Sequence, residues 1–417
     1  MLDCAPAVAS KTHSGRLPLS CAYMIEGLTA ISASLLMTGV AFYTTQKFHF
    51  STGQNLLLMM AQGIAYAAGA LSAGPVTRRV SKPATLIAVN CLIVVLTTAI
   101  SLGASTAVLI PLLLVNVFVS TFTWPLVESL VTEGCDAVHM NRRITVYNMI
   151  WSGMNVLVIA GYGTILQLWP AGPLVIPVIC HGIGVCIAII LALTHRTPAF
   201  VDSISHGDPE VAAQLASSRK MAMWLSRISL PASFVVANSL MGIFPTLRIS
   251  AEIGVAGATL VASIWMAGRF GIFILLGMTS FWHTRPRLLL GGGVLMLLSF
   301  LLTVLAAERL GMFQTMSTSV VVMIIIFAEL LFGIVAGFVF SASLYFGMVL
   351  SGGSTDHGGY HEALIGVGMV VGPGLAAGAQ HFSGTNTNWP AICSVAGLSI
   401  ITLAFAAIAA IRLRPRD

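Results

Sequence analysis

The sequence has very little charge. Aspartate, glutamate, lysine and arginine make up 8% of its 417 residues, whereas they make up about a quarter of an ordinary soluble domain. Hydrophobic residues make up 57%, which is more apolar sequence than a water-soluble core can use. This composition excludes a water-soluble protein and indicates an integral membrane protein.

The sequence also lacks the motifs of several catalytic and binding classes. Its seven cysteines have no Cys-x-x-Cys spacing, and it has no Walker lysine motif, no zinc-binding spacing and no serine elbow. We therefore expect no enzyme activity, no metal and no cofactor. The net charge of +6 fits loops that face anionic lipid, so we expect no nucleic-acid partner.

Long apolar runs recur along the chain. Each can cross about 30 Å of hydrocarbon at about 1.5 Å per helical residue. The expected spans lie near residues 19–44, 53–75, 84–103, 106–131, 145–167, 172–194, 228–247, 254–281, 287–307, 318–349, 361–382 and 389–411. The sequence therefore predicts an all-α membrane protein with twelve transmembrane helices.

One long polar stretch divides these spans into six and six. Within it, Asp208-Pro209-Glu210 is a strong helix start, and it predicts a short surface helix over 209–218 between flexible links. The expected domains are residues 1–193, a central cytoplasmic loop over 194–227, and residues 228–417.

The positive charges are distributed unevenly between the loops. Of 20 lysines and arginines, 16 fall in the tails and loops on one side, three (Lys47, Arg248 and Arg309) fall on the other, and Arg269 lies within a span. The positive-inside rule places the richer side, with both termini, in the cytoplasm. We expect a multi-pass protein of a bacterial cytoplasmic (inner) membrane.

The two halves share a pattern in their fifth helices, a tyrosine followed by glycines 6 and 14 residues later. The residues are Tyr147, Gly153 and Gly161 in the fifth span and Tyr360, Gly366 and Gly374 in the eleventh. A duplicated six-helix unit would leave such a repeat.

This plan resembles the major facilitator superfamily (MFS) of transporters. The loop from Gly74 to Leu86 adds to the resemblance, because the family's loop reads roughly G-x-L-a-D-R-x-G-r-R-x-x-L. The matching residues are Gly74, Val76, Arg79, Lys82 and Leu86. The departures are Arg78 for aspartate, Ser81 for glycine and Pro83 for a basic residue. The resemblance implies the MFS fold, two six-helix bundles around a central cavity, working as a monomer.

The departure at Arg78 leads to a hypothesis about the cytoplasmic gate. In the family, the aspartate at this position is thought to face the positive N-terminal end of the eleventh helix. Here Glu362 lies at that end, so Arg78 and Glu362 would form the latch with exchanged charges, beside Arg79 and Glu128. The alternative is two unrelated charges at a wet interface.

Charged residues within spans are candidates for coupling, because a charge at the bilayer centre is costly. Glu329 lies near the middle of the tenth span and Arg269 near the middle of the eighth. If they meet, Glu329 could exchange a proton while Arg269 holds it ionised or binds an anionic group of the solute. The alternative is a permanent buried ion pair that fixes helix packing.

Two further glutamates lie in the first half. Glu26 lies about two turns into the first span and is our second proton-coupling candidate. The family lines its cavity with the first, fourth, seventh and tenth helices, so Glu26 and Glu329 would face it from opposite halves. Glu128, near the inner end of the fourth span, could instead snorkel to the interface or pair with Arg142 or Arg143.

Polar and aromatic residues within spans are candidates to contact the solute. They are Arg269, Trp151, Asn155, Asn116 and Asn238. The segment Gly372-Pro373-Gly374 allows the eleventh helix to bend, which suits a gating helix, although static packing is an equal explanation.

These observations predict a secondary active transporter that moves a small organic solute through the lipid bilayer by alternating access. Without an ATP motif the energy must come from a gradient, and embedded glutamates favour protons. Export of an amphipathic solute is favoured over the alternative, uptake of a sugar or organic acid. A transport-inactive membrane sensor or assembly factor is the alternative from another class.

Overall fold

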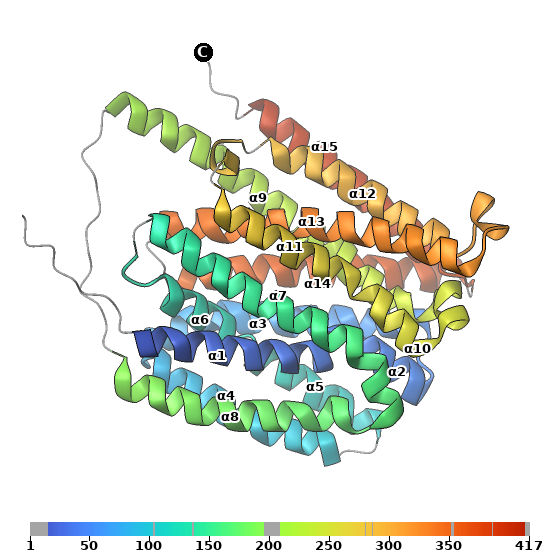
Figure 1. Ribbon diagram of the computed structural model, residues 1–417, viewed down its shortest axis with the longest axis horizontal. Coiled ribbons are helices and arrows are strands. Elements are labelled where there is room, and N and C mark those ends of the chain that lie inside the picture. Colours follow the sequence, from blue (N-terminus) through green and yellow to red (C-terminus); the bar gives the residue numbers. More distant parts are fainter. Residues whose placement is uncertain are drawn as a thin grey trace, which may run out of the picture.

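The computed structural model describes residues 16–102, 105–135, 137–195, 209–279, 281–285, 287–351, 354–385 and 387–412. These residues form helices joined by short loops and include no strand (Figure 1). Twelve of the described helices are long and apolar enough to cross a membrane. The prediction of an all-α, multi-pass membrane protein is therefore confirmed.

The helices of the first half lie in the lower part of Figure 1. They are α1 (Arg16–Ala33), the π-helical turn η1 (Ser34–Thr38), α2 (Val40–Phe48), α3 (Thr52–Thr77), α4 (Lys82–Leu102), α5 (Thr106–Ser120), α6 (Thr123–Thr132), α7 (Ala137–Leu168) and α8 (Gly172–Thr194).

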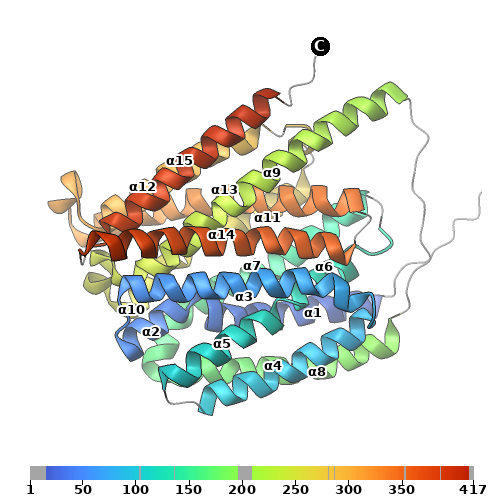
Figure 2. The same cartoon turned by 180° about the vertical axis from the view of Figure 1, so that it is seen from behind.

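The helices of the second half lie above them, and Figure 2 shows the same two groups from behind. They are α9 (Pro209–Ile243), η2 (Phe244–Thr246), α10 (Arg248–Ala262), α11 (Ile264–Met278), η3 (Phe281–Thr284), α12 (Leu288–Ala307), η4 (Gly311–Gln314), α13 (Thr318–Ser351), α14 (Thr355–Ser383) and α15 (Trp389–Arg412).

Several helices begin earlier than the sequence predicts from hydropathy, because their first turns are helical although they are polar. The eleventh span was expected from residue 361, but α14 begins at Thr355, where the Ser354 hydroxyl accepts a hydrogen bond from the His357 backbone N–H at 3.2 Å. The fifth span was expected from residue 145, and α7 begins at Ala137. Residues at these helix starts therefore lie deeper inside helices than the sequence suggested.

The central polar stretch is organised differently from the prediction. A helix begins at Pro209 as expected, but α9 continues without a break to Ile243, so the link expected after residue 218 is absent. Residues 219–227 contain arginine, lysine, methionine, alanine and leucine and no glycine or proline, so nothing in them ends a helix. Asp208 and the preceding link, residues 196–208, lie outside the described residues.

The two halves meet along α3 and α14, which lie side by side in both views (Figures 1 and 2). Glycines allow this approach. A Cβ atom built on Gly63 would lie 2.7 Å from the Met369 backbone, and one on Gly366 would lie 2.7 Å from the Ala67 side chain. The eleventh span thus packs backbone to backbone on the second.

A second contact joins α7 to α10 and α11. The Gly163 backbone N–H donates to the Thr259 hydroxyl at 3.0 Å, and Gly153 packs against Phe270. The fifth span therefore packs on the eighth, as the eleventh packs on the second. The repeated tyrosine and glycine pattern belongs to two helices with equivalent places in the two halves.

The halves also touch at both ends of this interface. At the end where α3 finishes and α14 begins, here called the basic end, Arg78 forms an ion pair with Asp356 at 2.7 Å. At the opposite end, Thr52 hydrogen bonds with Asn388 at 2.8 Å and with Thr246 at 2.6 Å. The space between the halves is therefore bounded by polar contacts at both ends.

Candidate functional site

A cavity of about 120 Å³ lies between the two halves. It is lined by α1, η1, α3, α6 and α7 from the first half and by α9, α11, α13 and α14 from the second. Cavities that combine an apolar wall with a few convergent polar groups bind small organic molecules. A position between the halves is also where two bundles moving against each other would expose a bound solute.

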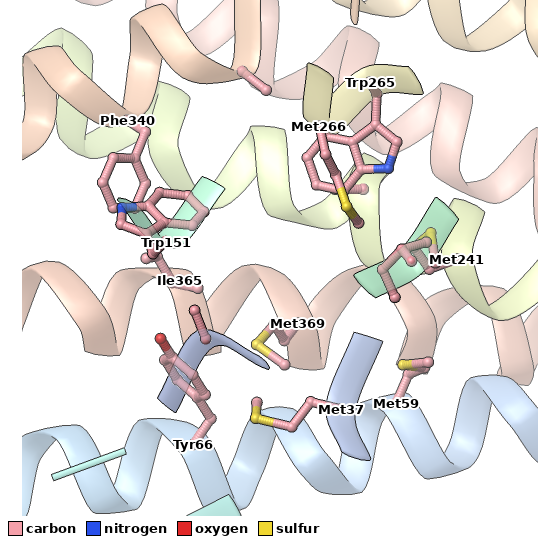
Figure 3. Close-up of a cluster of buried hydrophobic side chains, with 14 of the residues drawn as sticks. Met37, Met59, Tyr66, Trp151, Met241, Trp265, Met266, Phe340, Ile365 and Met369 are labelled. Atoms are coloured by element: carbon pink, nitrogen blue, oxygen red, sulfur yellow. The ribbon is translucent and has the colours of Figure 1, made fainter. Parts of the chain in front are cut away.

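The cavity wall is mainly aromatic and thioether (Figure 3). The aromatic residues are Tyr66, Trp124, Tyr147, Trp151, Phe234, Trp265 and Phe340. The methionines are Met37, Met59, Met241, Met266 and Met369. Aromatic rings offer flat apolar faces and methionines adapt to irregular shapes, so this wall suits a flat or amphipathic solute.

Arg269 carries the positive charge of the cavity wall. Its side chain is buried, and its guanidinium carbon lies 4.1 Å from the ring centroid of Trp151 and 4.6 Å from that of Trp265. Both contacts are close enough for cation–π attraction. Trp151 comes from the first half and Trp265 from the second, so Arg269 lies at the contact between them.

Asn155 extends this polar part of the wall. Its amide hydrogen bonds with the Ser34 hydroxyl at 2.6 Å, and the π-helical turn η1 holds Ser34 in place. In the amide orientation that satisfies all its neighbours, the Asn155 oxygen accepts from Arg269 Nη2 at 3.3 Å. Trp151, Asn155 and Arg269, predicted as cavity residues, are thus brought together on the cavity.

A cluster of carboxyl groups lies toward the basic end of the cavity. Glu362 of α14 lines the cavity and hydrogen bonds with the Tyr66 hydroxyl of α3, and one carboxyl oxygen of Glu362 lies within 4.8 Å of one of Glu128 of α6. Tyr147 of α7 donates to Glu128 Oε1 at 3.5 Å. Two carboxylates this close repel each other strongly, which favours a state in which at least one of them is protonated.

Glu26 completes this acid cluster, which we define as Glu26, Glu128 and Glu362. All three side chains are almost fully buried, and Glu26 lies against Trp124 near the other two. No ion pair involving these acids forms within the described residues. Glu26 and Glu128 belong to the first half and Glu362 to the second, so the acid cluster spans the interface.

A histidine borders the acid cluster. One atom each from Glu128, Glu362 and His361 lie within 4.8 Å of one another, and His361 Nδ1 hydrogen bonds with the Ser343 hydroxyl at 3.1 Å. A divalent cation would require both carboxyls to be ionised. Two ionised carboxylates side by side in this buried site would be costly without such an ion.

Glu329, the first coupling candidate from the sequence, lies elsewhere. Its carboxyl is buried beside Thr303 of α12, and it is not among the cavity-lining residues. Both Glu329 and Arg269 are described, and no ion pair joins them. Arg269 faces the cavity from α11 while Glu329 faces the interior of the second half, so the expected pair does not form.

The expected latch between Arg78 and Glu362 does not form either. Arg78 pairs with Asp356 at 2.7 and 2.9 Å, and the side chains are 62% and 52% exposed. Glu362 lies six residues further along α14, about 9 Å deeper at the helical rise, where it reaches Tyr66. Arg79, the other basic gate candidate, is exposed.

Glu128 is also deeper than expected. It is buried in the acid cluster and does not pair with the arginines that follow α6. The Arg143 guanidinium donates instead to the Val131 carbonyl at 3.1 Å. Glu128 faces inward because α6 packs on α14, where Gly358 lies against its carboxyl.

The remaining predicted residues take different places. Asn238 lines the cavity and donates to the Phe234 carbonyl at 3.1 Å, whereas Asn116 is buried in α5 away from the cavity. Within α14, Gly372 packs on α9 and Gly374 packs on Met60 of α3, with Pro373 between them inside a continuous helix. A bend at Pro373 during gating remains a prediction.

Several solved structures share this fold. The crystal structure of the nucleoside transporter NupG matches with a TM-score of 0.65 at 13% identity, covering 95% of this chain and 99% of that chain. A bacterial homologue of the human lysosomal transporter Spinster, inward-facing and occupied, matches with a TM-score of 0.63 at 16% identity, covering 96% and 98%. A variant of the E. coli fucose:proton symporter FucP matches with a TM-score of 0.58 at 15% identity, covering 95% and 99%.

No family model matches the sequence, and no curated protein matches it. The structural matches cover nearly the whole chain and confirm the predicted MFS fold. At these identities the likeness concerns the fold.

Proposed function

We propose that this protein is a secondary active transporter that moves a small organic solute by alternating access and couples this movement to protons through the acid cluster. The observation that carries the proposal is the acid cluster itself. Three buried carboxyl groups from both halves meet beside the cavity, and none of them forms an ion pair with a described residue. The nucleoside, Spinster-like and fucose:proton transporters that share the fold support a solute-transport role.

The acid cluster supplies a physical link between protonation and opening. When the halves separate at the basic end, Glu362 leaves Tyr66 and Glu128, and all three carboxyls meet water, where the ionised form is well solvated. Closing this end again buries the carboxyls, and an unpaired carboxylate is costly to bury. Protons that reach the acid cluster from the opposite side while the basic end is closed, and that leave to the cytoplasm when it opens, would link the movement of the halves to the proton gradient.

The sidedness of this mechanism follows from the sequence. The basic end faces the cytoplasm by the positive-inside rule, which places both termini there, in a bacterial inner membrane. The halves, residues 1–193 and 228–417, are the moving units, and the protein works as a monomer. Export driven by proton entry is the proposed direction, and uptake with protons is the alternative.

Reconstitution tests this proposal directly. Purified protein in vesicles that contain a pH-sensitive dye is given uridine, fucose, benzoate or naphthoate, and solute and proton movements are followed together. Solute movement accompanied by proton movement supports the proposal, and its direction relative to the proton flow separates export from uptake. Solute movement without proton movement refutes proton coupling. If the protein moves none of these solutes, a sensor or assembly factor with a sealed cavity is favoured.

A further inference from the structure

We propose that the solute is an organic anion with a flat apolar body and that Arg269 binds its anionic group, typically a carboxylate. This inference rests on the proposed function because it takes the cavity as the solute site. It adds a chemical class to a site that otherwise suits many amphipathic molecules. The argument depends on the charge of Arg269, on its unfilled hydrogen-bonding capacity and on the wall around it.

No acid among the described residues supplies a counter-charge for Arg269. Its side chain is 3% exposed, and it forms no ion pair with any acid of the described residues. Glu362 hydrogen bonds with Tyr66 and Glu128 with Tyr147, and neither pairs with Arg269. A buried cation is costly without a partner, and an anion entering the cavity would supply one.

The guanidinium also has an unsatisfied, buried donor. Its group carries five N–H donors in one plane, and Nε has no hydrogen-bond partner. Contacts with Trp151 and Trp265 fix its position. A fixed planar fork of donors binds a carboxylate through two parallel hydrogen bonds.

The side chains around Arg269 determine which kind of apolar body the anion can have. Phe340 lies against Trp151 with ring centroids 5.0 Å apart, and Met266 and Met369 line the space across from these rings (Figure 3). Flat rings and polarizable thioethers favour an aromatic or planar body. A small inorganic anion would leave this apolar wall uncovered.

Paired ligands of equal shape test the inference in purified protein. Naphthoate and the neutral naphthamide have the same body and differ in charge, and their affinities are measured by isothermal titration calorimetry. Wild type should bind naphthoate more tightly by about tenfold or more, because charge-assisted hydrogen bonds are about twice as strong as neutral ones. Equal affinities, or binding of neither ligand, would overturn the inference.

Variants of Arg269 and Glu329 test which residue causes the preference for naphthoate over naphthamide. Arg269→Met should abolish the preference for naphthoate while keeping naphthamide binding, and Arg269→Lys should retain part of it. Glu329→Gln, a buried charge removed outside the cavity, should leave the preference unchanged. An Arg269→Met protein that still prefers naphthoate, or that loses both ligands equally, shows a structural role only and contradicts the inference.

Two controls keep the result interpretable. If Arg269→Met does not purify in a folded state, Arg269→Gln replaces it and the same preference is measured. Binding in detergent does not require transport, so a carboxylate preference without solute movement in vesicles would refute the proposed function alone. Transport of neutral solutes without a carboxylate preference would refute this inference alone.

Discussion

The contact between the two halves and the interior of the second half each bury a glutamate, but the two surroundings differ. Glu362, on the interface, touches a tyrosine and a glutamate of the other half and borders the cavity. Glu329, inside the second half, lies beside Thr303 of the neighbouring helix. Opening the interface changes the contacts of Glu362 and leaves those of Glu329 intact.

This difference distinguishes a glutamate that can couple proton binding to movement from one that only packs against its neighbours. A group can link proton binding to movement only when its energy differs between the two states of the machine. Glu362 meets this condition because its partners belong to the opposite half. Glu329 moves with its own neighbours as one body, so we assign it a structural role.

Neutralising each glutamate gives the largest expected contrast. A pH difference of about one unit supplies about 1.4 kcal/mol, so without a membrane potential one-for-one coupling sustains about a tenfold solute gradient. Glu362→Gln should lose this accumulation, and Glu329→Gln should retain it. Accumulation in vesicles under an imposed pH gradient measures both.

Exchange of labelled for unlabelled solute controls for folding, because exchange requires no net proton movement. Glu362→Gln should still exchange solute although it no longer accumulates it. Loss of accumulation in Glu329→Gln with full accumulation in Glu362→Gln would reverse the assignment.

A smaller contrast comes from glycines on one helix. A Cβ added at Gly366 would lie 2.7 Å from Ala67, whereas nothing lies within 4 Å of one added at Gly378. Gly366→Ala should therefore destabilise the closed interface by about 1–3 kcal/mol, as overpacking does. Thermal unfolding in detergent measures the cost, and Gly378→Ala, which should not lower the melting temperature, is its control.

The smallest effect is expected at the exposed rim of the same interface. Arg78→Ala removes the ion pair with Asp356, and such solvent-exposed pairs contribute about 0–1 kcal/mol. Transport should change little, and whatever stabilisation the pair provides should decrease as salt is added. A transport defect as large as that of Glu362→Gln would make the rim, and not the acid cluster, the controlling gate.

The sequence predicted the architecture well because it depends on run length and charge. Apolar runs revealed twelve spans, and the rarity of charge within them pointed to Glu26, Glu128, Arg269 and Glu329 as special. It could not predict which way each side chain faces. Glu329 lies in Ile-Phe-Ala-Glu-Leu-Leu-Phe, which is apolar all around, so hydropathy does not reveal the helix rotation.

Glu362 was misplaced for a different reason. From hydropathy alone, the helix is predicted to begin at residue 361. This would place Glu362 in the first turn, where it could form a latch with Arg78. The helix begins at Thr355, so Glu362 lies two turns inside it and reaches the cavity. The polar first turn, with Asp356, His357 and three glycine or serine neighbours, hid this start because it is helical without being apolar.

The glycine-lined contact between α3 and α14 has a consequence for the speed of the cycle. Because glycines bring the two backbones together there, fewer side chains would have to change rotamer for one half to roll on the other in the proposed cycle. Most of the activation barrier would then come from the polar contacts at the two ends and from the acid cluster between them. Protons and solute, which can reach those groups, would set the turnover rate.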